Sequence, residues 1–123
     1  MSARIMIVDD EALITESMAM LLMRHGYMTP VVAHSGEDAV RLAGEAKPDL
    51  VLMDIGLGWG MDGVEAASLI RAFSNVPVIF VTAQGDWATM ERAKSVGAAG
   101  YVLKPFSFNE LSGAIETALM SCK

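Results

Sequence analysis

The sequence contains a single cysteine, which limits how the fold can be stabilised. Cys122 is next to last among 123 residues, so no disulfide can form within the chain. We expect its side chain to lie in solvent, and a reducing compartment is consistent with this composition. At 13.1 kDa the chain is long enough for one domain, residues 1–123, to bury about two-thirds of its unfolded surface in a core.

Basic residues are also few. The chain carries 9 Lys and Arg against 15 Asp and Glu, which gives a net charge of -6 and a pI near 4.7. Binding to nucleic acid without sequence preference requires clustered positive charge, whereas these basic residues are scattered. We therefore expect no direct contact with nucleic acid, and we expect any DNA or RNA output to come from another chain or a partner.

Long hydrophobic runs are absent, although 53% of the residues are hydrophobic and the mean hydropathy is +0.40. The apolar runs extend over about four to six residues, whereas about 20 are needed to span a bilayer. The first residues enter a strand pattern directly, without the apolar segment of a signal peptide. We expect a core-rich cytoplasmic protein with no membrane association.

Strand-like and helix-like patterns alternate five times along the chain. The strand-like runs are rich in Val and Ile and almost continuously apolar, as is typical of parallel strands covered by helices on both faces. The expected strands are residues 4–8, 30–33, 50–53, 78–81 and 101–103. Pro30 favours an edge position for the second strand. The pattern predicts an α/β protein of the (βα)5 type around a parallel sheet.

The expected helices have start and stop signals. They are residues 11–24, a second helix capped by Ser35 and Asp38, residues 63–73, residues 86–96, and a fifth helix with a capping box of Ser107 and Glu110. On the first helix we place Leu13, Met18, Met20, Leu21 and Met23 on or near the buried side. Most of the ten methionines are expected to fill gaps in the core, because the thioether chain adapts to irregular space.

Five polar residues stand directly after the apolar runs, where parallel strands end. They are Asp9, Asp10, Asp54, Thr82 and Lys104. Ligand crevices of open α/β sheets lie outside the carboxyl ends of the strands, so we expect these residues to share one edge. An alternative interpretation remains for Asp9 and Asp10 alone, because adjacent carboxylates also cap a following helix.

Three carboxylates at one edge repel each other, and their pKa values rise unless a cation is present. Mg²⁺ suits such a site, with Mn²⁺ as an alternative, because it takes oxygen ligands from carboxylates and phosphate. Lys104 adds a positive charge and Thr82 adds a hydroxyl donor. This combination predicts a site that holds a phosphoryl group on a carboxylate.

The motifs that carry these residues are those of a known family. They are Val8-Asp9-Asp10-Glu11, Leu52-Met53-Asp54-Ile55, Val81-Thr82-Ala83 and Tyr101-Val102-Leu103-Lys104-Pro105-Phe106. With them, essentially the whole chain resembles the receiver domains of two-component response regulators. The resemblance implies a single-domain flavodoxin-like fold, a three-layer sandwich with a five-stranded parallel sheet in the order 2-1-3-4-5.

The resemblance also implies a role for each site residue. Asp54 would be the phosphorylated aspartate, and Asp9, Asp10, Asp54 and the carbonyl of Gly56 would bind the metal. Thr82 and Lys104 would bind the phosphoryl oxygens, and Tyr101 would swing inward with Thr82 on activation. A cis peptide would precede Pro105, and Gly56 and Gln84 would set how fast water removes the phosphate.

The implied function is a phosphoacceptor switch rather than an enzyme. A histidine kinase or phosphotransfer protein would supply the phosphoryl group, and the surface of the fourth helix, fifth strand and fifth helix would change. That surface would serve a downstream target or effector domain, with the chain a monomer or a weak dimer. A stand-alone receiver and a part of a larger regulator are both compatible with the sequence.

The chain departs from the receiver pattern in one segment. Gly58 takes the place of a proline usual in the family, and Asp62-Gly63 arrives one residue late. We expect residues 56–61 to form a longer, more flexible loop beside the site. Trp59 and Trp87 fall near the same edge, and for both we leave open a partner contact or ordinary packing.

Two other functions remain as alternatives. An aspartyl-phosphate hydrolase would also use a nucleophilic aspartate, but such enzymes resemble D-x-D-x-T at the first strand, whereas Asp9 and Asp10 are adjacent. A non-phosphorylated interaction module on the same scaffold would lack an essential group, and each group named above is present.

Overall fold

The computed structural model describes residues 3–121, which form five strands and five helices in alternation. The elements are β1 (Arg4–Val8), α1 (Ala12–Arg24), β2 (Met28–Ala33), α2 (Gly36–Ala46), β3 (Leu50–Met53), α3 (Gly63–Arg71), β4 (Val78–Thr82), α4 (Trp87–Ser95), β5 (Gly100–Leu103) and α5 (Phe108–Ser121). Cys122, expected in solvent, lies outside the described residues. None of the helices within 3–121 is long and apolar enough to cross a membrane.

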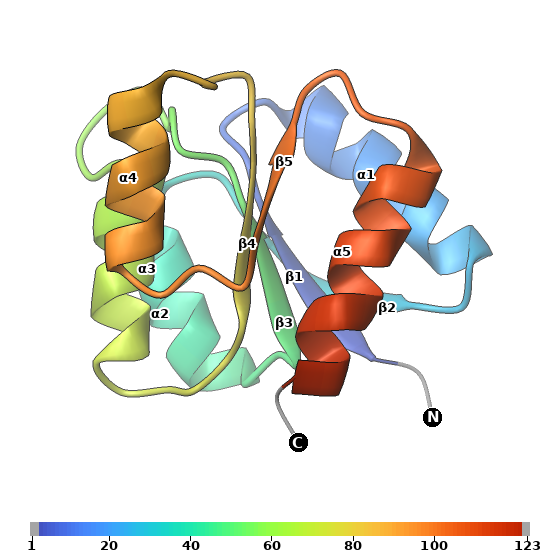
Figure 1. Cartoon of the computed structure of the whole chain (residues 1–123). Helices are drawn as coiled ribbons and strands as arrows, with labels where there is room; N and C mark the ends of the chain where they lie inside the picture. The colour runs from blue at the N-terminus through green and yellow to red at the C-terminus, as the bar shows by residue number, and fades with distance from the viewer. Residues whose placement is uncertain (1–2, 122–123) are drawn as a thin grey trace.

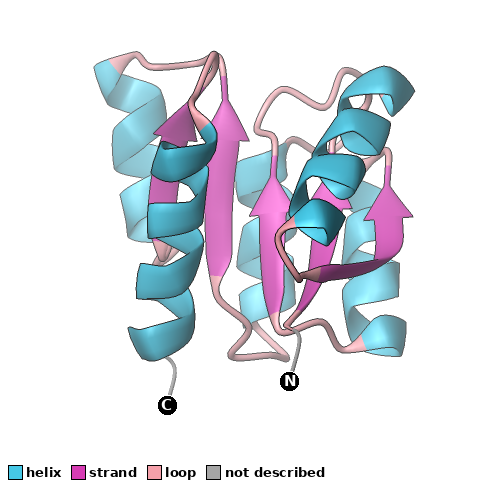
Figure 2. Ribbon diagram, turned by 90° about the vertical axis from the view of Figure 1, so that its right-hand side faces the viewer, coloured by secondary structure: helices cyan, strands magenta, loops and turns pink. Residues whose placement is uncertain are grey.

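The strands form one parallel sheet in the order β2-β1-β3-β4-β5, as the resemblance implied (Figure 2). Helices α1 and α5 cover one face, and α2, α3 and α4 cover the other (Figure 1). The three-layer α/β arrangement is therefore confirmed. β2 lies at an edge, as Pro30 predicted, but it begins at Met28, two residues earlier than expected.

The central strands β1, β3 and β4 are almost completely buried, because helices cover both of their faces. Successive side chains of a strand point to opposite faces. Met53 and Phe80 accordingly belong to the core cluster beneath α2, α3 and α4, whereas Leu52 and Ile79 belong to the one beneath α1 and α5. These two cores hold the carboxyl ends of the central strands in fixed register.

The expected buried side of α1 was partly wrong. Met18 and Leu22 are buried and Leu21 is half-buried, but Leu13, Met20 and Met23 are exposed. Apolar residues occur on more than one side of this helix. The sequence pattern therefore did not show which stripe of side chains faces the sheet. Thr15, Met18 and Leu22 form that stripe at helical spacing.

The expectation that most methionines fill the core was only partly correct. Met6, Met18 and Met53 are buried and Met61 and Met90 are half-buried, whereas Met20, Met23, Met28 and Met120 are exposed. Both tryptophans are exposed too, with 94% of Trp59 and 77% of Trp87 accessible to solvent, which rules out ordinary core packing for them.

Candidate functional site

The register of the sheet brings the predicted polar residues to one edge. Val8 pairs with Met53, so Asp9 and Asp54 leave neighbouring strands at the same level. The Asp54 N–H donates to the carbonyl of Val8 at 2.9 Å. On the other side of β3, the Lys104 N–H donates to the carbonyl of Thr82 at 2.9 Å. Adjacent parallel strands therefore position these residues, as the sequence predicted.

Asp9, Asp10 and Asp54 form a compact acidic cluster. One carboxylate oxygen from each lies within 4.8 Å of the others. The Asp9 side chain is 2% exposed and that of Asp54 12%, whereas Asp10 is exposed. Three converging carboxylate oxygens of mixed burial fit a hard divalent cation that retains water on its open side.

Asp9 also has a local structural role. Its Oδ1 accepts a hydrogen bond from the N–H of Glu11 at 2.9 Å, and Glu11 is the N-cap residue of α1. This bond closes a turn just before α1, whose N-cap residue Glu11 makes no side-chain cap bond, so the capping interpretation is not confirmed. The other oxygen, Oδ2, faces the acidic cluster and Lys104.

Lys104 is the cation of this site. Its ammonium nitrogen lies 2.7 Å from Asp9 Oδ2 and 3.3 Å from Asp54 Oδ2. Burial lowers the pKa of Lys104, but the hydrogen bond to Asp9 and the charges of Asp54 and Asp9 outweigh it, so the pKa lies above its ordinary value. The lysine is therefore fully charged at neutral pH.

The pKa of Asp54 is raised above its ordinary value. Burial is the largest cause, and the charge of Asp9 adds to it, while Lys104 and a hydrogen bond from Thr82 act in the opposite direction. The chain thus holds a carboxylate partly desolvated at the sheet edge. A partly desolvated carboxylate beside a fixed ammonium is suited to accept and retain a phosphoryl group.

Thr82, Gln84 and Tyr101 form a second group at this edge. Thr82 is buried, and its Oγ1 accepts a hydrogen bond from the Gln84 N–H at 3.3 Å. The Tyr101 hydroxyl donates to the carbonyl oxygen of Gln84. Tyr101 therefore contacts the segment between β4 and α4 rather than Asp54 itself.

Gly56 and Gln84 face each other across the site. A Cβ added at Gly56 would lie 2.7 Å from the Nε2 of Gln84, so the amide of Gln84 occupies the space that a side chain at position 56 would fill. The two residues that the resemblance paired are thus brought together. The Lys104–Pro105 peptide is cis, as the resemblance implied.

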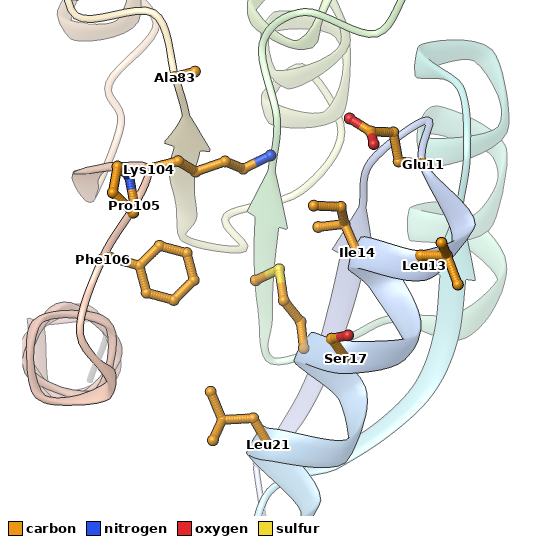
Figure 3. A pocket seen from close by; sticks show the side chains of 10 residues that line it. Glu11, Leu13, Ile14, Ser17, Leu21, Ala83, Lys104, Pro105 and Phe106 are labelled. Carbon is orange, nitrogen blue, oxygen red and sulfur yellow. The ribbon is translucent and has the colours of Figure 1, made fainter.

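An apolar groove of about 800 Å³ opens beside the site, between α1 and the residues that follow β5. Figure 3 shows Ile14 and Leu21 of α1 facing Phe106 across it. The side chain of Lys104 extends over the groove toward the end of β3. Part of the surface next to the acidic cluster is therefore hollow and apolar.

Sequence reasoning missed the role of Gly63. This residue begins α3, and a Cβ added to it would lie only 2.0 Å from the carbonyl oxygen of Asp54. No other residue lets α3 begin so close to the end of β3. The only sequence signal for this role was the Asp62-Gly63 pair. The pair indicates that a helix begins here, but it does not indicate that the first residue of the helix contacts Asp54.

Comparison with known proteins agrees with this site. Residues 5–116 match the family model of the response regulator receiver domain. The chain is 41% identical over 116 residues to the transcriptional regulatory protein PdtaR of Mycobacterium tuberculosis, and 38% identical over 118 residues to the transcriptional regulatory protein YvrH of Bacillus subtilis. These matches cover 94% and 96% of this chain but 56% and 49% of the two relatives, so the chain spans about half their length.

Solved structures also resemble this chain. The signal receiver domain of a modulated diguanylate cyclase from Desulfovibrio desulfuricans superposes with a TM-score of 0.92 at 37% identity, covering 99% of this chain and 97% of that one. The sequence match, the shared fold and the arrangement of the acidic edge all agree. The chain belongs to the family of response regulator receiver domains.

Proposed function

We propose that this protein is a phosphoacceptor switch that receives a phosphoryl group on Asp54. The observation that carries the proposal is the placement of the Lys104 ammonium between Asp54 and Asp9, at an edge where three carboxylates converge. A lysine in this position neutralises charge on a phosphorylated Asp54. Family membership favours this function over a hydrolase or a non-phosphorylated interaction module.

In the transfer, a carboxylate oxygen of Asp54 forms a bond to phosphorus as the N–P bond of a donor phosphohistidine breaks. The imidazole nitrogen retains the electron pair of that bond and takes up a proton. Asp9, Asp10, Asp54 and the carbonyl of Gly56 would hold a Mg²⁺ or Mn²⁺ ion, which supplies charge neutralisation during transfer. Lys104 and the Thr82 hydroxyl then bind the phosphoryl oxygens.

The switch acts through Thr82, Gln84 and Tyr101. When the Thr82 hydroxyl turns toward a phosphoryl oxygen, it weakens its bond with the Gln84 N–H, and Gln84 also holds the Tyr101 hydroxyl. Phosphorylation therefore changes the segment between β4 and α4 and the exposed surface of α4, β5 and α5. Gln84 and Gly56 set how fast water reaches the phosphorus.

The phosphodonor is a histidine kinase or a phosphotransfer protein, and it docks over the apolar groove. The groove is continuous with the phosphorylation site because Lys104 lines both. A histidine kinase takes its phosphate from ATP, so we expect the protein to act in the cytoplasm. A downstream target protein or a linked effector domain reads the changed surface, in keeping with relatives about twice as long as this chain.

The test is phosphorylation by a small donor. Incubation with acetyl phosphate and Mg²⁺ should increase the intact mass by one phosphoryl group. Asp54→Asn should abolish the increase, whereas Asp38→Asn, at an exposed acid on α2, should leave it unchanged. Undiminished uptake by Asp54→Asn would refute the proposal.

A further inference from the structure

Residues 56–61 connect the phosphorylation site to α3 by a loop that lies partly in the core. Leu57 is buried, Trp59 is 94% exposed and Met61 is half-buried against the core beneath α2 and α3. Gly58 and Gly60 have φ values of 74° and 73°, a region that residues with a Cβ rarely adopt. The loop thus contains glycines that allow backbone freedom, and its buried residues still hold it in one conformation.

The first turn of α2 holds this path. The N–H of Met61 donates to Oε2 of Glu37 at 3.2 Å. Throughout residues 3–121, this is the only hydrogen bond that joins the 56–61 segment to another element. A Cβ added at Gly60 would lie 2.7 Å from the same Glu37 oxygen, and one added at Gly36 would lie 2.8 Å from the carbonyl oxygen of Met61. The loop and the start of α2 are therefore in close contact.

The same loop reaches the acidic cluster at its other end. A Cβ added at Gly58 would lie 3.2 Å from Oδ2 of Asp10, so the Gly58 backbone passes directly beside that carboxylate. Asp10 is the exposed member of the three clustered acids. Contacts therefore run from Glu37 through the loop to Asp10.

We propose that Glu37 is a positioning residue of the phosphorylation site, which holds the 56–61 loop against Asp10 and so strengthens cation binding. The inference rests on the proposed function and adds a residue that the receiver motifs do not include. Without the carboxylate of Glu37, a segment with three glycines gains backbone freedom, which must be lost again when the cation binds. The cation then binds more weakly although none of its ligands has changed.

A simpler role for Glu37 must be separated from this one. Glu37 and Asp38 both lie in the first turn of α2, where a negative charge stabilises the helix. The Asp38 side chain pairs with Arg41 on its own helix, and within residues 3–121 it forms no hydrogen bond or ion pair with the loop. Asp38→Ala is therefore a matched control, since it removes a first-turn charge and leaves the loop contact intact.

The experiment measures cation affinity for four forms of the 123-residue chain. Binding of Mn²⁺, whose free ion is counted by electron paramagnetic resonance, is compared for the wild type, Glu37→Ala, Glu37→Gln and Asp38→Ala. Loss of one hydrogen bond from an exposed loop predicts about fivefold weaker binding for Glu37→Ala. Glu37→Gln retains an oxygen that accepts from the Met61 N–H and should stay within about twofold of the wild type, as should Asp38→Ala.

Two outcomes overturn the inference. Equal affinities of Glu37→Ala and Asp38→Ala would show that the loop contact does not matter, and equal weakening by Glu37→Gln and Glu37→Ala would show that only charge matters. Intact mass after acetyl phosphate separates this result from the proposed function. If the wild type takes up phosphate and Glu37→Ala binds Mn²⁺ normally, only the positioning role is refuted. If Glu37→Ala binds Mn²⁺ more weakly but the wild type takes up no phosphate, only the phosphoacceptor function is refuted.

Discussion

Lys104 lies closer to Asp9 than to Asp54. The ammonium nitrogen is 2.7 Å from Asp9 Oδ2 and 3.3 Å from Asp54 Oδ2. The Asp9 side chain is the more buried of the two, so its charge depends more strongly on a nearby cation. Lys104 therefore compensates the same carboxylate that the proposed metal ion requires.

This relationship predicts that Lys104 competes with the divalent cation. Lys104→Met removes one positive charge beside three carboxylates, and we expect about three- to tenfold tighter binding of Mg²⁺. Calorimetric titration measures the affinity. Lys94→Met, at an exposed lysine of α4, is the control and should change nothing. Weaker binding by Lys104→Met would show that the lysine helps to build the metal site instead.

Gly63 predicts a large loss of stability from a single methyl group. A Cβ at this position would lie 2.0 Å from the carbonyl oxygen of Asp54, and neither backbone can move without disturbing the sheet edge. We expect Gly63→Ala to destabilise the fold by about 3 kcal/mol, measured by urea unfolding. Gly113, in α5, has no atom within 4 Å of its added Cβ, so Gly113→Ala should stabilise by about 0.5–1 kcal/mol. Equal effects of the two variants would contradict the close contact.

The sequence was sufficient to predict where the site lies. Asp9, Asp54 and Lys104 each follow an apolar run, and parallel strands must bring such positions to one edge. The strand order came from the family resemblance, because five similar apolar runs do not distinguish their neighbours. The bounds of the elements differed from the expected ones by at most two residues, as for Met28 in β2.

Contacts between distant segments were beyond the sequence pattern. The Glu37–Met61 bond joins residues 24 apart, one in the first turn of α2 and one in an irregular loop, and no periodicity relates them. The sequence pattern also could not predict which side of α1 is buried, for a different reason. Leu13, Met20 and Met23 are as apolar as Met18 and Leu22, so only the packing of the helix on the sheet selects the buried stripe.

Tyr101 predicts a local change without a global one. Its hydroxyl donates to the Gln84 carbonyl, and Tyr101→Phe removes that bond while the ring is retained. We expect backbone amides of residues 84–90 to exchange hydrogen about fivefold faster, because one exposed hydrogen bond contributes about 1 kcal/mol. Tyr27→Phe, at a half-buried residue packed against the core cluster beneath α1 and α5, is the control. Unchanged exchange in residues 84–90 would show that the hydroxyl does not restrain this segment.

Asp62 connects α3 to α4 and carries a lowered pKa. Its Oδ1 accepts from the Glu65 N–H at 2.9 Å as the N-cap of α3, and its Oδ2 lies 2.7 Å from Arg92 Nη2 on α4. Burial raises the pKa of Asp62, but the hydrogen bonds from Glu65 and Arg92 outweigh it, so the pKa lies below its ordinary value of 3.8. The carboxylate therefore stabilises the folded chain above that value.

This pKa predicts how the stability of a variant depends on pH. Asp62→Asn retains a side-chain oxygen for the cap but loses the ion pair, and we expect a loss of about 0.5–1 kcal/mol at pH 7. Because the folded pKa is the lower one, the contribution is complete above pH 3.8 and disappears as the pH falls through the folded pKa. The difference in unfolding free energy between the wild type and Asp62→Asn should therefore be constant from pH 7 to 5 and shrink toward zero at the acid end of the transition, measured by urea unfolding at each pH.

Arg92→Met removes the same ion pair from the other side and should show the same pH dependence. A difference in unfolding free energy that grows on acidification would contradict the assignment.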